Sequence, residues 1–500
     1  MFWIIVVLLI AFAALWLFRE FSYYGLGLGV SSRLAYQGKR YASIKILRKM
    51  LARKSIVGRA IRGTIYLRLT WMLLSEKQFD ECIEECEAFL REIKNSALVS
   101  MVRTRMADAH EAAGRTDDAE AQRNLAASDL QEGPENPTTL LAKAQGLTRS
   151  QKYPEAIELL QRALELGGKR SPHLRATLLC NLSNCAFNAG RMHEAADWAE
   201  EAANAGGDVK ITALANKSAG TAFGSLGDLE KSERFYQQTV DLQKKMGDRE
   251  GAGQTMAALA GITRKRGYLT EAIGLCDEAA TQSLTAKRMA RMQQYECLMA
   301  LGRYDEARQM LEISMKSNSL AVPVFEKRVQ GLSYVGHANI HLSKREPSEA
   351  IPYLDQAADH YSTDPKLTRM VKSYRVWALG QLGDSDVVEN LTAELEESLT
   401  TFPDDRSGSL SCNHFLARAW MELKEPEKAL GYLDRYVALG PDPVDIPKYR
   451  YLKAECLKML GRTEDARIEY QAAVDCGIET YYSAQAKLRL SELQAGEAKE

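Results

Sequence analysis

Two pairs of side chains in this chain have the spacing of metal ligands that share one helix face. Cys82 and Cys86 are four residues apart, and so are His337 and His341. Zinc needs three or four convergent ligands, and neither pair has a second pair at a usable spacing. We therefore expect no metal ion, and we interpret Cys82 and Cys86 as core residues.

The other candidates for chemistry are equally incomplete. Gly25, Gly27 and Gly29 superficially resemble a phosphate loop, but they follow an apolar run rather than a strand, and no Lys-Ser or Lys-Thr follows them. We interpret them as a flexible hinge. The seven His are dispersed, and no Ser, Cys or acid stands out as a nucleophile with its base. The sequence predicts no cofactor and no enzymatic activity.

A small residue recurs along the chain at intervals of 35 to 43 residues, usually shortly after a glycine. It falls at Ile44, Cys82, Ala119, Ala156, Ala195, Ser232, Ala272, Ala307, Ala350, Val388, Ala429 and Ala466. A fixed period in this range is typical of a helical solenoid, in which each unit buries its apolar face against its neighbours.

The spacing within a unit is helical. Leu140, Ala144 and Leu147 share one face of a first helix, and Ala156 and Leu160 share one face of a second. Steps of three and four residues make an apolar stripe on a helix, whereas strands have a period of two. No window shows that shorter period, so we predict an all-α fold.

The unit resembles a tetratricopeptide repeat (TPR), whose two helices carry a large, Leu, small, aromatic pattern followed by a Gly-x-Tyr-x-x-Ala turn. Residues 140–166, which include Lys152-Tyr153-Pro154-Glu155-Ala156-Ile157, match this pattern closely, and so do residues 291–314. The resemblance extends from about 31 to 477. It implies a right-handed α-solenoid of about twelve TPR-like helix pairs.

The N-terminus carries an apolar run from Phe2 to Phe18 without a charged residue. As a helix this run spans roughly 26 Å, at the short end of what crosses a bilayer. Trp3 and Trp16 lie near its ends, as interfacial aromatic residues do. A cleaved signal peptide and a buried core helix are the alternatives, but no basic segment precedes the run. We predict one retained transmembrane helix.

These observations divide the chain into five segments. They are a transmembrane signal-anchor helix at 1–19, a juxtamembrane hinge at 20–30, the repeat array at 31–477, a C-terminal capping helix at 478–495 and a disordered tail at 496–500.

Charge predicts the orientation of the anchor. Residues 19–68 hold twelve Lys or Arg and one Glu, a charge of +11, whereas the other 53 basic and 65 acidic residues give −12. Basic residues beside an anchor stay on the cytoplasmic side. We expect the array to face the cytoplasm and seven cations to contact anionic lipid headgroups. These are Lys39, Arg40, Lys45, Arg48, Lys49, Arg53 and Lys54.

The nine cysteines support the same compartment. An odd number, scattered mostly within apolar helix stripes, is not a disulfide framework. A thiol-rich chain fits a reducing environment.

The resemblance to TPR proteins also implies a peptide-binding groove, because in those arrays the first helix of each pair lines a concave surface. Projected onto this sequence, that register places one aromatic residue and seven polar or basic ones in the middle of the groove. They are Asn184, Phe187, Asn188, Lys217, Thr221, Gln254, Arg264 and Lys265.

We therefore predict a non-enzymatic, single-pass membrane scaffold, similar in layout to bacterial envelope-assembly regulators, with protein or peptide partners and without a small-molecule substrate. It lacks the C-terminal Cys-x-x-Cys module of those regulators. One alternative is an envelope-assembly protein with its repeats outside the cytoplasm. The other is an RNA-binding array, against which the acidic body argues because phosphate contacts need many cations. We expect no nucleic acid partner.

Overall fold

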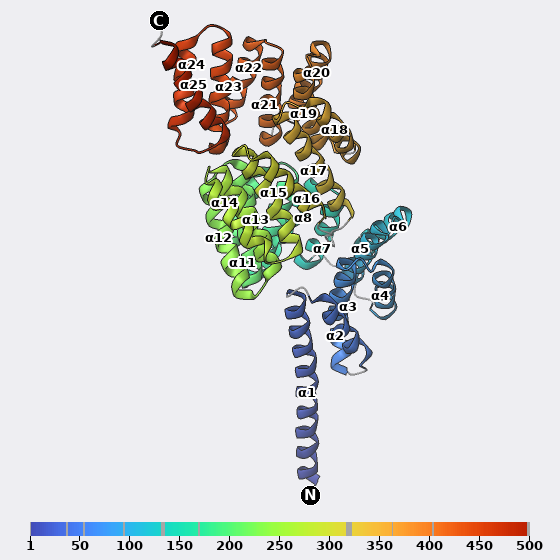
Figure 1. The fold of residues 1–500 in the computed structure, drawn as a ribbon. Helices are drawn as coiled ribbons and strands as arrows, with labels where there is room; N and C mark the ends of the chain where they lie inside the picture. Colours follow the sequence, from blue (N-terminus) through green and yellow to red (C-terminus); the bar gives the residue numbers. More distant parts are fainter. Residues whose placement is uncertain are drawn as a thin grey trace. The chain divides into compact units, whose positions relative to one another are not determined.

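The computed structural model describes residues 2–36, 39–53, 56–93, 96–131, 136–168, 171–316, 323–362, 364–402 and 405–497. Across these ranges the chain forms α-helices and one 3₁₀ helix, and no strand. The prediction of an all-α fold is therefore confirmed for the described part of the chain (Figure 1).

The helices alternate between first and second members of antiparallel pairs. The first members are α1 (Phe2–Tyr36), α3 (Ile56–Ser75), α5 (Ser96–Ala112), α7 (Pro137–Arg149), α9 (Pro172–Asn188), α11 (Val209–Leu226), α13 (Arg249–Lys265), α15 (Leu284–Ala300), α17 (Pro323–Ser343), α19 (Pro365–Leu382), α21 (Arg406–Glu422) and α23 (Ile446–Met459). The second members are α2 (Arg40–Ala52), α4 (Phe79–Glu92), α6 (Thr116–Gln131), α8 (Tyr153–Gly167), α10 (Met192–Asn204), α12 (Leu229–Met246), α14 (Leu269–Ala280), α16 (Tyr304–Lys316), α18 (Pro347–Tyr361), α20 (Ser385–Thr401), α22 (Pro426–Ala438) and α24 (Thr463–Asp475). The short 3₁₀ helix η1 (Pro443–Asp445) precedes α23, and a last helix, α25 (Tyr481–Glu497), follows the final pair.

The small residue of each sequence unit lies on the second helix of a pair, from Ile44 on α2 to Ala466 on α24. All twelve of these positions are buried, and only Ile44 retains measurable exposure, at 4%. A small side chain lets the second helix approach the first closely, and the register predicted from the sequence is therefore confirmed.

The turn inside each pair has a fixed backbone conformation. From the second pair to the twelfth, all within the described residues, the residue five positions before the small one has a positive φ. Seven of these residues are glycines, and the others are Lys77, Gln151, Arg345 and Lys424, with φ between 59° and 63°. The left-handed conformation reverses the chain in the fewest residues, which brings the small residue onto the preceding helix.

Backbone hydrogen bonds close these turns in the manner of a Schellman motif. The Arg191 amide donates to the Ala186 carbonyl at 2.8 Å, and the Arg303 amide donates to the Leu298 carbonyl at 2.9 Å. The same bond joins the equivalent residues of the other pairs, for example Arg462 to Leu457 at 2.9 Å. From the second pair to the twelfth, each first helix thus ends with a carbonyl group of its last turn accepting a hydrogen bond from the turn.

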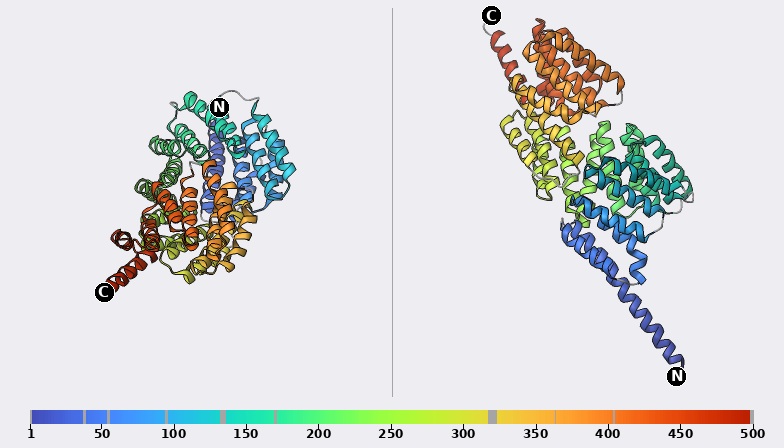
Figure 2. Two further views of the ribbon diagram at one scale, coloured as in Figure 1. Left: turned by 90° about the horizontal axis from the view of Figure 1, so that it is seen from above. Right: turned by 90° about the vertical axis from the view of Figure 1, so that its right-hand side faces the viewer.

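Helix α1 differs from the sequence prediction. Residues 20–30, predicted as a hinge, are helical, and α1 runs without interruption from Phe2 to Tyr36. Its C-terminal half is the first helix of the first pair and packs on α2 and α3. The backbone of its N-terminal half extends beyond those helices (Figure 2). The prediction of a hinge is wrong.

Packing explains the continuity of α1. A Cβ at Gly27 would lie 2.7 Å from the sulfur of Met50. This glycine therefore lets α1 and α2 pack closely, and it does not mark a flexible hinge. Tyr24 is 1% exposed, and its hydroxyl donates to the Arg53 carbonyl at 3.3 Å. The hydroxyl of Ser31 lies 2.6 Å from that of Ser43. These contacts hold α1 as a helix where its glycines alone favour a break.

The chain divides into two compact units. The first comprises residues 1–222, 238–252 and 320–323, and the second comprises residues 223–237, 253–319 and 324–500. Apolar residues of α1 to α5 form one core in the first unit. Apolar residues of α17 to α23 form the largest core of the second. Each core lies between neighbouring pairs, as expected of an array without a central core.

The predicted anchor lies largely outside the residues whose side chains the structure describes. Among the residues that it does describe, no helix is long and apolar enough to span a bilayer. The predicted capping helix corresponds to α25, which begins at Tyr481 and continues to Glu497. Of the predicted tail, residues 498–500 lie outside the described residues.

The left-handed turn predicts opposite effects at two equivalent positions. Replacing Gly461 by Ala lowers the free energy of unfolding by about 1 kcal/mol, and replacing Lys424 by Gly raises it by about the same amount. The φ angles are 73° at Gly461 and 60° at Lys424, where a Cβ is unfavourable. Thermal unfolding followed by circular dichroism measures both shifts.

Gly431→Ala is the matched control. Gly431 lies inside α22, and an added Cβ would have no heavy atom within 4 Å. Alanine is favoured over glycine in a helix by roughly 0.5–1 kcal/mol, so this substitution is stabilising. If Gly461→Ala and Gly431→Ala shift the unfolding midpoint in the same direction, the proposed role of the turn is incorrect.

Candidate functional site

All eight residues predicted to line a groove lie on first helices of pairs. Their positions are Asn184, Phe187 and Asn188 on α9, Lys217 and Thr221 on α11, and Gln254, Arg264 and Lys265 on α13. The first five belong to the first unit and the last three to the second. The two surfaces are therefore described separately.

The surface of the first unit is rich in amide groups. Asn184 and Asn188 are exposed on α9, and the Asn188 side-chain amide donates to the Asn184 carbonyl at 2.7 Å. The Gln145 amide on α7 donates to Asn181 on α9 at 3.4 Å, which places these first helices next to each other. Amide groups both donate and accept, which suits them to pair with a peptide backbone.

Lys217 and Thr221 contribute less to this surface than predicted. Burial lowers the pKa of Lys217, while the negative charge of Asp248 acts in the opposite direction. The Thr221 hydroxyl donates to the Lys217 carbonyl of its own helix at 3.0 Å. Lys217 is half-buried beside an acid, and the donor of Thr221 is already used.

The first helices of the second unit surround a cavity of about 170 Å³. Its charged walls come from four helices and from η1, namely Arg264 of α13, Glu296 of α15, Arg418 of α21, Lys448 of α23 and Asp445 of η1. Its uncharged walls include Met299, Tyr304, Asn339, Tyr374, His414, Phe415, Thr480 and Tyr482. Of the predicted groove residues, Arg264 lines this cavity.

The charged groups of the cavity differ in whether they have a partner. Lys448 lies 2.7 Å from Asp445, and Lys265, just outside the cavity, lies 3.3 Å from Asp442. Burial raises the pKa of Asp445, but Lys448 and Arg264 more than offset this, and the pKa is lowered. Asp445 is therefore a carboxylate that satisfies Lys448.

The guanidinium groups of Arg264 and Arg418 have no such partner. Neither forms an ion pair with any carboxylate of the described residues, and the Arg264 Nε is buried without a hydrogen-bond acceptor there. The Arg418 guanidinium carbon lies 3.5 Å from the centre of the Trp377 ring, a cation–π contact that fixes its position. The cavity thus presents two cations without an ion-pair partner in the described part of the chain, of which Arg418 is held in place by Trp377.

His414 is the most buried titratable group of the cavity wall. It is 6% exposed, and its Nδ1 atom has no hydrogen-bond partner among the described residues. Burial, together with the positive charges of Lys448 and Arg418, lowers its pKa well below the usual value. The imidazole is neutral at physiological pH.

The cavity lies where the last pairs of the second unit contact its first ones. Val444 of η1 packs in one cluster with Leu269, Ala272 and Cys297 of α14 and α15. The ring centre of Tyr481, on α25, lies 6.2 Å from that of Tyr304, on α16. These contacts join α14–α16 to η1 and α25.

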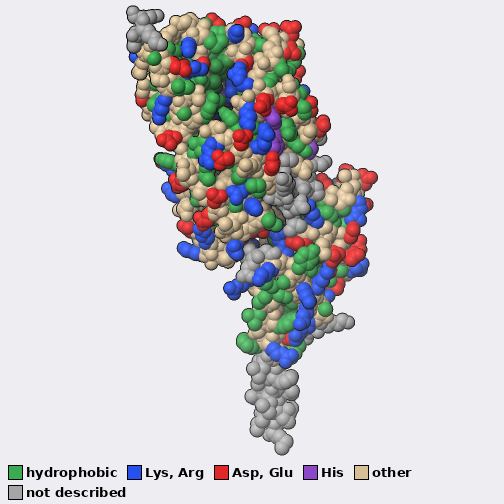
Figure 3. Space-filling model, viewed as in Figure 1, with side chains coloured by type: hydrophobic (Ala, Val, Ile, Leu, Met, Phe, Trp, Pro, Cys, Tyr) green, Lys and Arg blue, Asp and Glu red, His purple; other side chains and the backbone are tan. Residues whose placement is uncertain are grey.

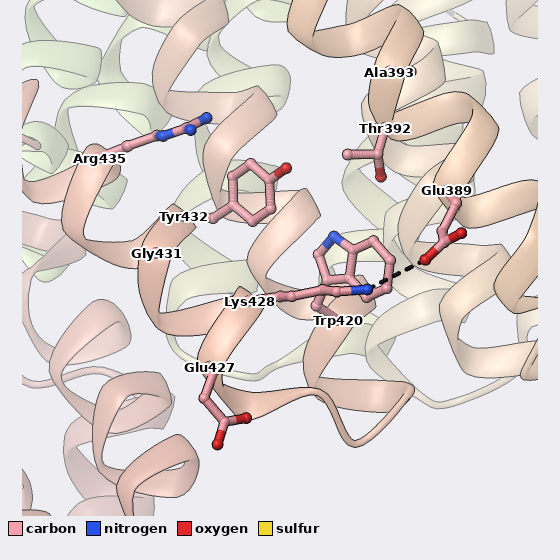
Figure 4. A pocket seen from close by; sticks show the side chains of 9 residues that line it. All are labelled: Glu389, Thr392, Ala393, Trp420, Glu427, Lys428, Gly431, Tyr432 and Arg435. Carbon is pink, nitrogen blue, oxygen red and sulfur yellow. Dashed lines mark hydrogen bonds and ion pairs between the residues drawn. The ribbon is translucent and has the colours of Figure 1, made fainter.

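A second hollow of about 470 Å³ lies between the second helices α20 and α22 (Figure 4). Lys428 lies 3.2 Å from Glu389 and 3.9 Å from the centre of the Trp420 ring. Tyr432 donates to Glu396 at 2.9 Å, and Arg435 pairs with the same carboxylate at 2.6 Å. Lys428 and Arg435 thus both have acidic partners, whereas Arg264 and Arg418 have none in the described part of the chain, so the cavity lined by the first helices is the stronger candidate for a binding site.

Part of the predicted lipid-contact surface is paired within the protein. Arg40 lies 2.8 Å from Glu250 and 3.3 Å from Glu76, and Arg48 lies 2.6 Å from Glu81. Glu81 and Glu85 raise the pKa of Arg48, against the effect of burial. These arginines join helices to one another.

Arg53 pairs with Glu20, the buried acid of α1. Lys39, Lys45 and Lys49 are exposed, and Lys54 lies outside the described residues. Figure 3 shows Lys and Arg side chains beside apolar ones over α2 and α3, near the N-terminal end of the chain. Among the described residues of the basic flank, Lys39, Lys45 and Lys49 are thus exposed without an acidic partner, and Arg48 is exposed but ion-paired.

The pairs with the spacing of metal ligands have other roles. Cys82 and Cys86 are fully buried in the core of the first unit, as predicted. His337 and His341 both stack on Tyr353, at 5.2 and 5.6 Å between ring centres. In the described part of the chain no three His, Cys, Asp or Glu residues gather as metal ligands would.

The sequence profile of the tetratricopeptide repeat family matches residues 135–206, which hold α7 to α10. The predicted resemblance is confirmed over this segment. No curated protein matches the chain.

Two solved structures are similar to the chain at low identity. One is the crystal structure of a Rap protein complexed with the competence and sporulation factor, with 15% identity and a TM-score of 0.43, covering 79% of this chain and 99% of that one. The other is the human IFIT1 dimer with m7Gppp-AAAA, with 12% identity and a TM-score of 0.43, covering 80% of this chain and 95% of that one.

Sequence reasoning missed most of the cavity. Arg418, His414 and Lys448 lie on α21 and α23, more than a hundred residues after Arg264. The signal that was available is that each lies on a first helix, whose faces were predicted to line the concave surface. Which of these residues meet depends on the contact between the first and last pairs of the unit, and no local pattern encodes that contact.

The buried His414 predicts a pH dependence of stability. Its folded-state pKa is lowered, so below about pH 6.5 the unfolded chain takes up a proton that the folded chain does not. Stability is therefore lost as the pH falls from 7 to 5, and His414→Asn reduces this loss. Differential scanning calorimetry at several pH values gives the slope of the unfolding midpoint.

The control is Asn188→Ala, at an exposed position on α9, which removes no titratable group. It leaves the pH slope of the unfolding midpoint unchanged. An equal slope in His414→Asn and in the unaltered protein would show that His414 titrates in the folded state as it does in the unfolded one.

Proposed function

We propose that this protein is a non-enzymatic, membrane-anchored scaffold whose TPR-like repeats bind protein or peptide partners at the cytoplasmic face of a membrane. The observation that carries the proposal is the repeated helix-pair register. It buries the small residue of the second helix in each pair and leaves polar side chains of the first helices, such as Asn184 and Asn188, exposed to a partner. Repeat arrays use such surfaces for binding.

The state of the thiols supports a binding role rather than catalysis. Eight of the nine cysteines are buried, and none is in a disulfide. Burial raises the pKa of Cys180, Cys276, Cys297 and Cys456 to about 12, so each stays a protonated thiol, which is a poor nucleophile. Free thiols also fit the reducing cytoplasm.

Features of α1 and α2 support the membrane anchor. The apolar run from Phe2 to Phe18 continues into exposed apolar residues on α1, of which Phe21 is 62% exposed and Leu26 is 69% exposed. Lys45 and Lys49 are exposed on the adjacent α2. An apolar segment beside accessible lysines suits the boundary between hydrocarbon and anionic headgroups.

The anchor predicts the behaviour of the full chain in cell fractionation. The protein stays in the membrane pellet after a carbonate wash, and a variant lacking residues 2–18 moves to the soluble fraction, because the apolar run holds it in the bilayer. A reporter that fluoresces only in the cytoplasm, fused to the C-terminus, gives a signal. Immunoblotting of the fractions and fluorescence of intact cells provide the measurements.

Lys45→Ala with Lys49→Ala is the control, because it removes charge and leaves the apolar run intact. It remains in the carbonate-washed pellet. Recovery of the full chain in the carbonate supernatant would refute the anchor, and a signal only from a reporter active outside the cytoplasm would refute the orientation.

The binding surface predicts a difference between the two helices of one pair. A photo-crosslinking amino acid at Asn188, exposed on α9, forms crosslinks to partner proteins in cells at least about fivefold more often than one at His193, exposed on α10. Mass spectrometry of the crosslinked products quantifies both. Equal yields of the same products from the two positions would contradict a partner site on the first helices.

A further inference from the structure

The cavity of the second unit has properties that a surface for an extended peptide does not require. It is lined by six first helices, by η1, by Tyr304 of α16 and by Thr480 and Tyr482 at the start of α25, and it is partly open. Its volume of about 170 Å³ is below the roughly 300–1,000 Å³ of sites for drug-sized ligands. The part of a ligand that enters it must therefore be small.

The charge of the cavity is unbalanced. Three cations line it, against the two carboxylates of Glu296 and Asp445, and Asp445 is already paired with Lys448. Glu296 is exposed at the rim of α15, whereas the Arg264 Nε is buried without an acceptor among the described residues. Leaving a buried N–H donor of a guanidinium unsatisfied is unfavourable, and one anion would remove that cost.

The polar groups of the wall can bind the oxygens of a carboxylate. The guanidinium of Arg418 is held on Trp377, so little side-chain entropy is lost when it binds. His414 is more than nine-tenths buried, lines the cavity, and has an Nδ1 atom without a partner in the described part of the chain. A neutral imidazole donates one hydrogen bond, which a carboxylate oxygen accepts.

The remaining walls are apolar or aromatic. Tyr374 and Phe415 have ring centres 4.1 Å apart, and Met299 adds a flexible thioether. Tyr304 is half-buried, and burial raises its pKa to about 12, so its hydroxyl stays neutral. These walls favour an apolar body attached to the anionic group.

We propose that this cavity binds one carboxylate group carrying a short apolar body, supplied either by a free organic acid or by the C-terminal residue of a peptide. Arg264 and Arg418 bind the carboxylate, His414 donates to it, and the aromatic walls contact the apolar part. This site goes beyond the proposed scaffold function, because capture of a protein partner on α9 does not depend on it.

The test compares two ligands of the same shape. Isothermal titration calorimetry of the full-length protein with hexanoate and with hexanamide separates the carboxylate from its apolar body. Hexanoate binds with one site per chain, and hexanamide binds at least about tenfold more weakly, because the amide is uncharged.

A pentapeptide ending in leucine, with a free or an amidated C-terminus, distinguishes the two sources of the carboxylate. Tighter binding of hexanoate than of the peptide with a free C-terminus assigns a small organic acid as the ligand. Tighter binding of that peptide than of hexanoate assigns a chain terminus.

Variants connect the affinity to the cavity. Arg264→Gln weakens hexanoate binding at least about tenfold. Arg418→Gln has the same effect, and circular dichroism checks that the loss of its contact with Trp377 has not unfolded the unit. Arg462→Gln, at an exposed position in the turn before α24, leaves the affinity unchanged.

Three outcomes would overturn the proposal. The first is equal affinity for hexanoate and hexanamide. The second is no binding of hexanoate or of the peptide with a free C-terminus up to 10 mM, which is about the weakest affinity such a site is expected to have. The third is an unchanged affinity for hexanoate in folded Arg264→Gln. None of them alters the crosslinking from Asn188, so failure of the carboxylate site and failure of the scaffold function are distinguishable.

Discussion

The fold depends on one contact that is repeated along the chain, the packing of a small side chain from the second helix of each pair against the first. Ala195, Ala307 and Ala466 are each fully buried at this position, five residues after a glycine with positive φ. The left-handed turn sets the start of the second helix, and the small side chain sets its distance from the first. Where Lys424 replaces the glycine, the packing is kept although the backbone conformation is less favourable.

This contact also determines which residues remain for function. The apolar face of the second helix is buried against the first helix of its own pair and against the neighbouring pair. The charge of Lys428, on such a helix, is paired as well, with Glu389. The first helices carry groups that the packing does not use, such as Asn184 in the first unit and Arg418 in the second. A binding surface therefore follows from the architecture, while its chemistry differs from pair to pair.

The sequence predicted the local features well, because they rest on contacts between residues close in the chain. The twelve small positions, the helical pairs and the core role of Cys82 all follow from spacings below about forty residues. Contacts that depend on how one helix packs on another were missed. Gly27 was interpreted as part of a hinge because its neighbour Met50 lies on another helix, and Arg40 was assigned to lipid although Glu250 lies beside it. The meeting of Tyr304 with Tyr481 depends on rotations that accumulate over several pairs.

The continuity of α1 has a mechanical consequence for the proposed anchor. One helix contains both the apolar run and the first member of the first pair, and the Glu20–Arg53 ion pair and the contact of Gly27 with Met50 fix that helix to α2. An α-helix transmits rotation and tilt along its axis, because each residue is hydrogen-bonded to the next turn. A change in the tilt of the apolar run therefore moves α2, with Lys45 and Lys49 on its surface, as one body. A flexible hinge at 20–30 would have let the first pair and the apolar run move independently. With a continuous helix, the orientation of the first pair depends on the tilt of the apolar run.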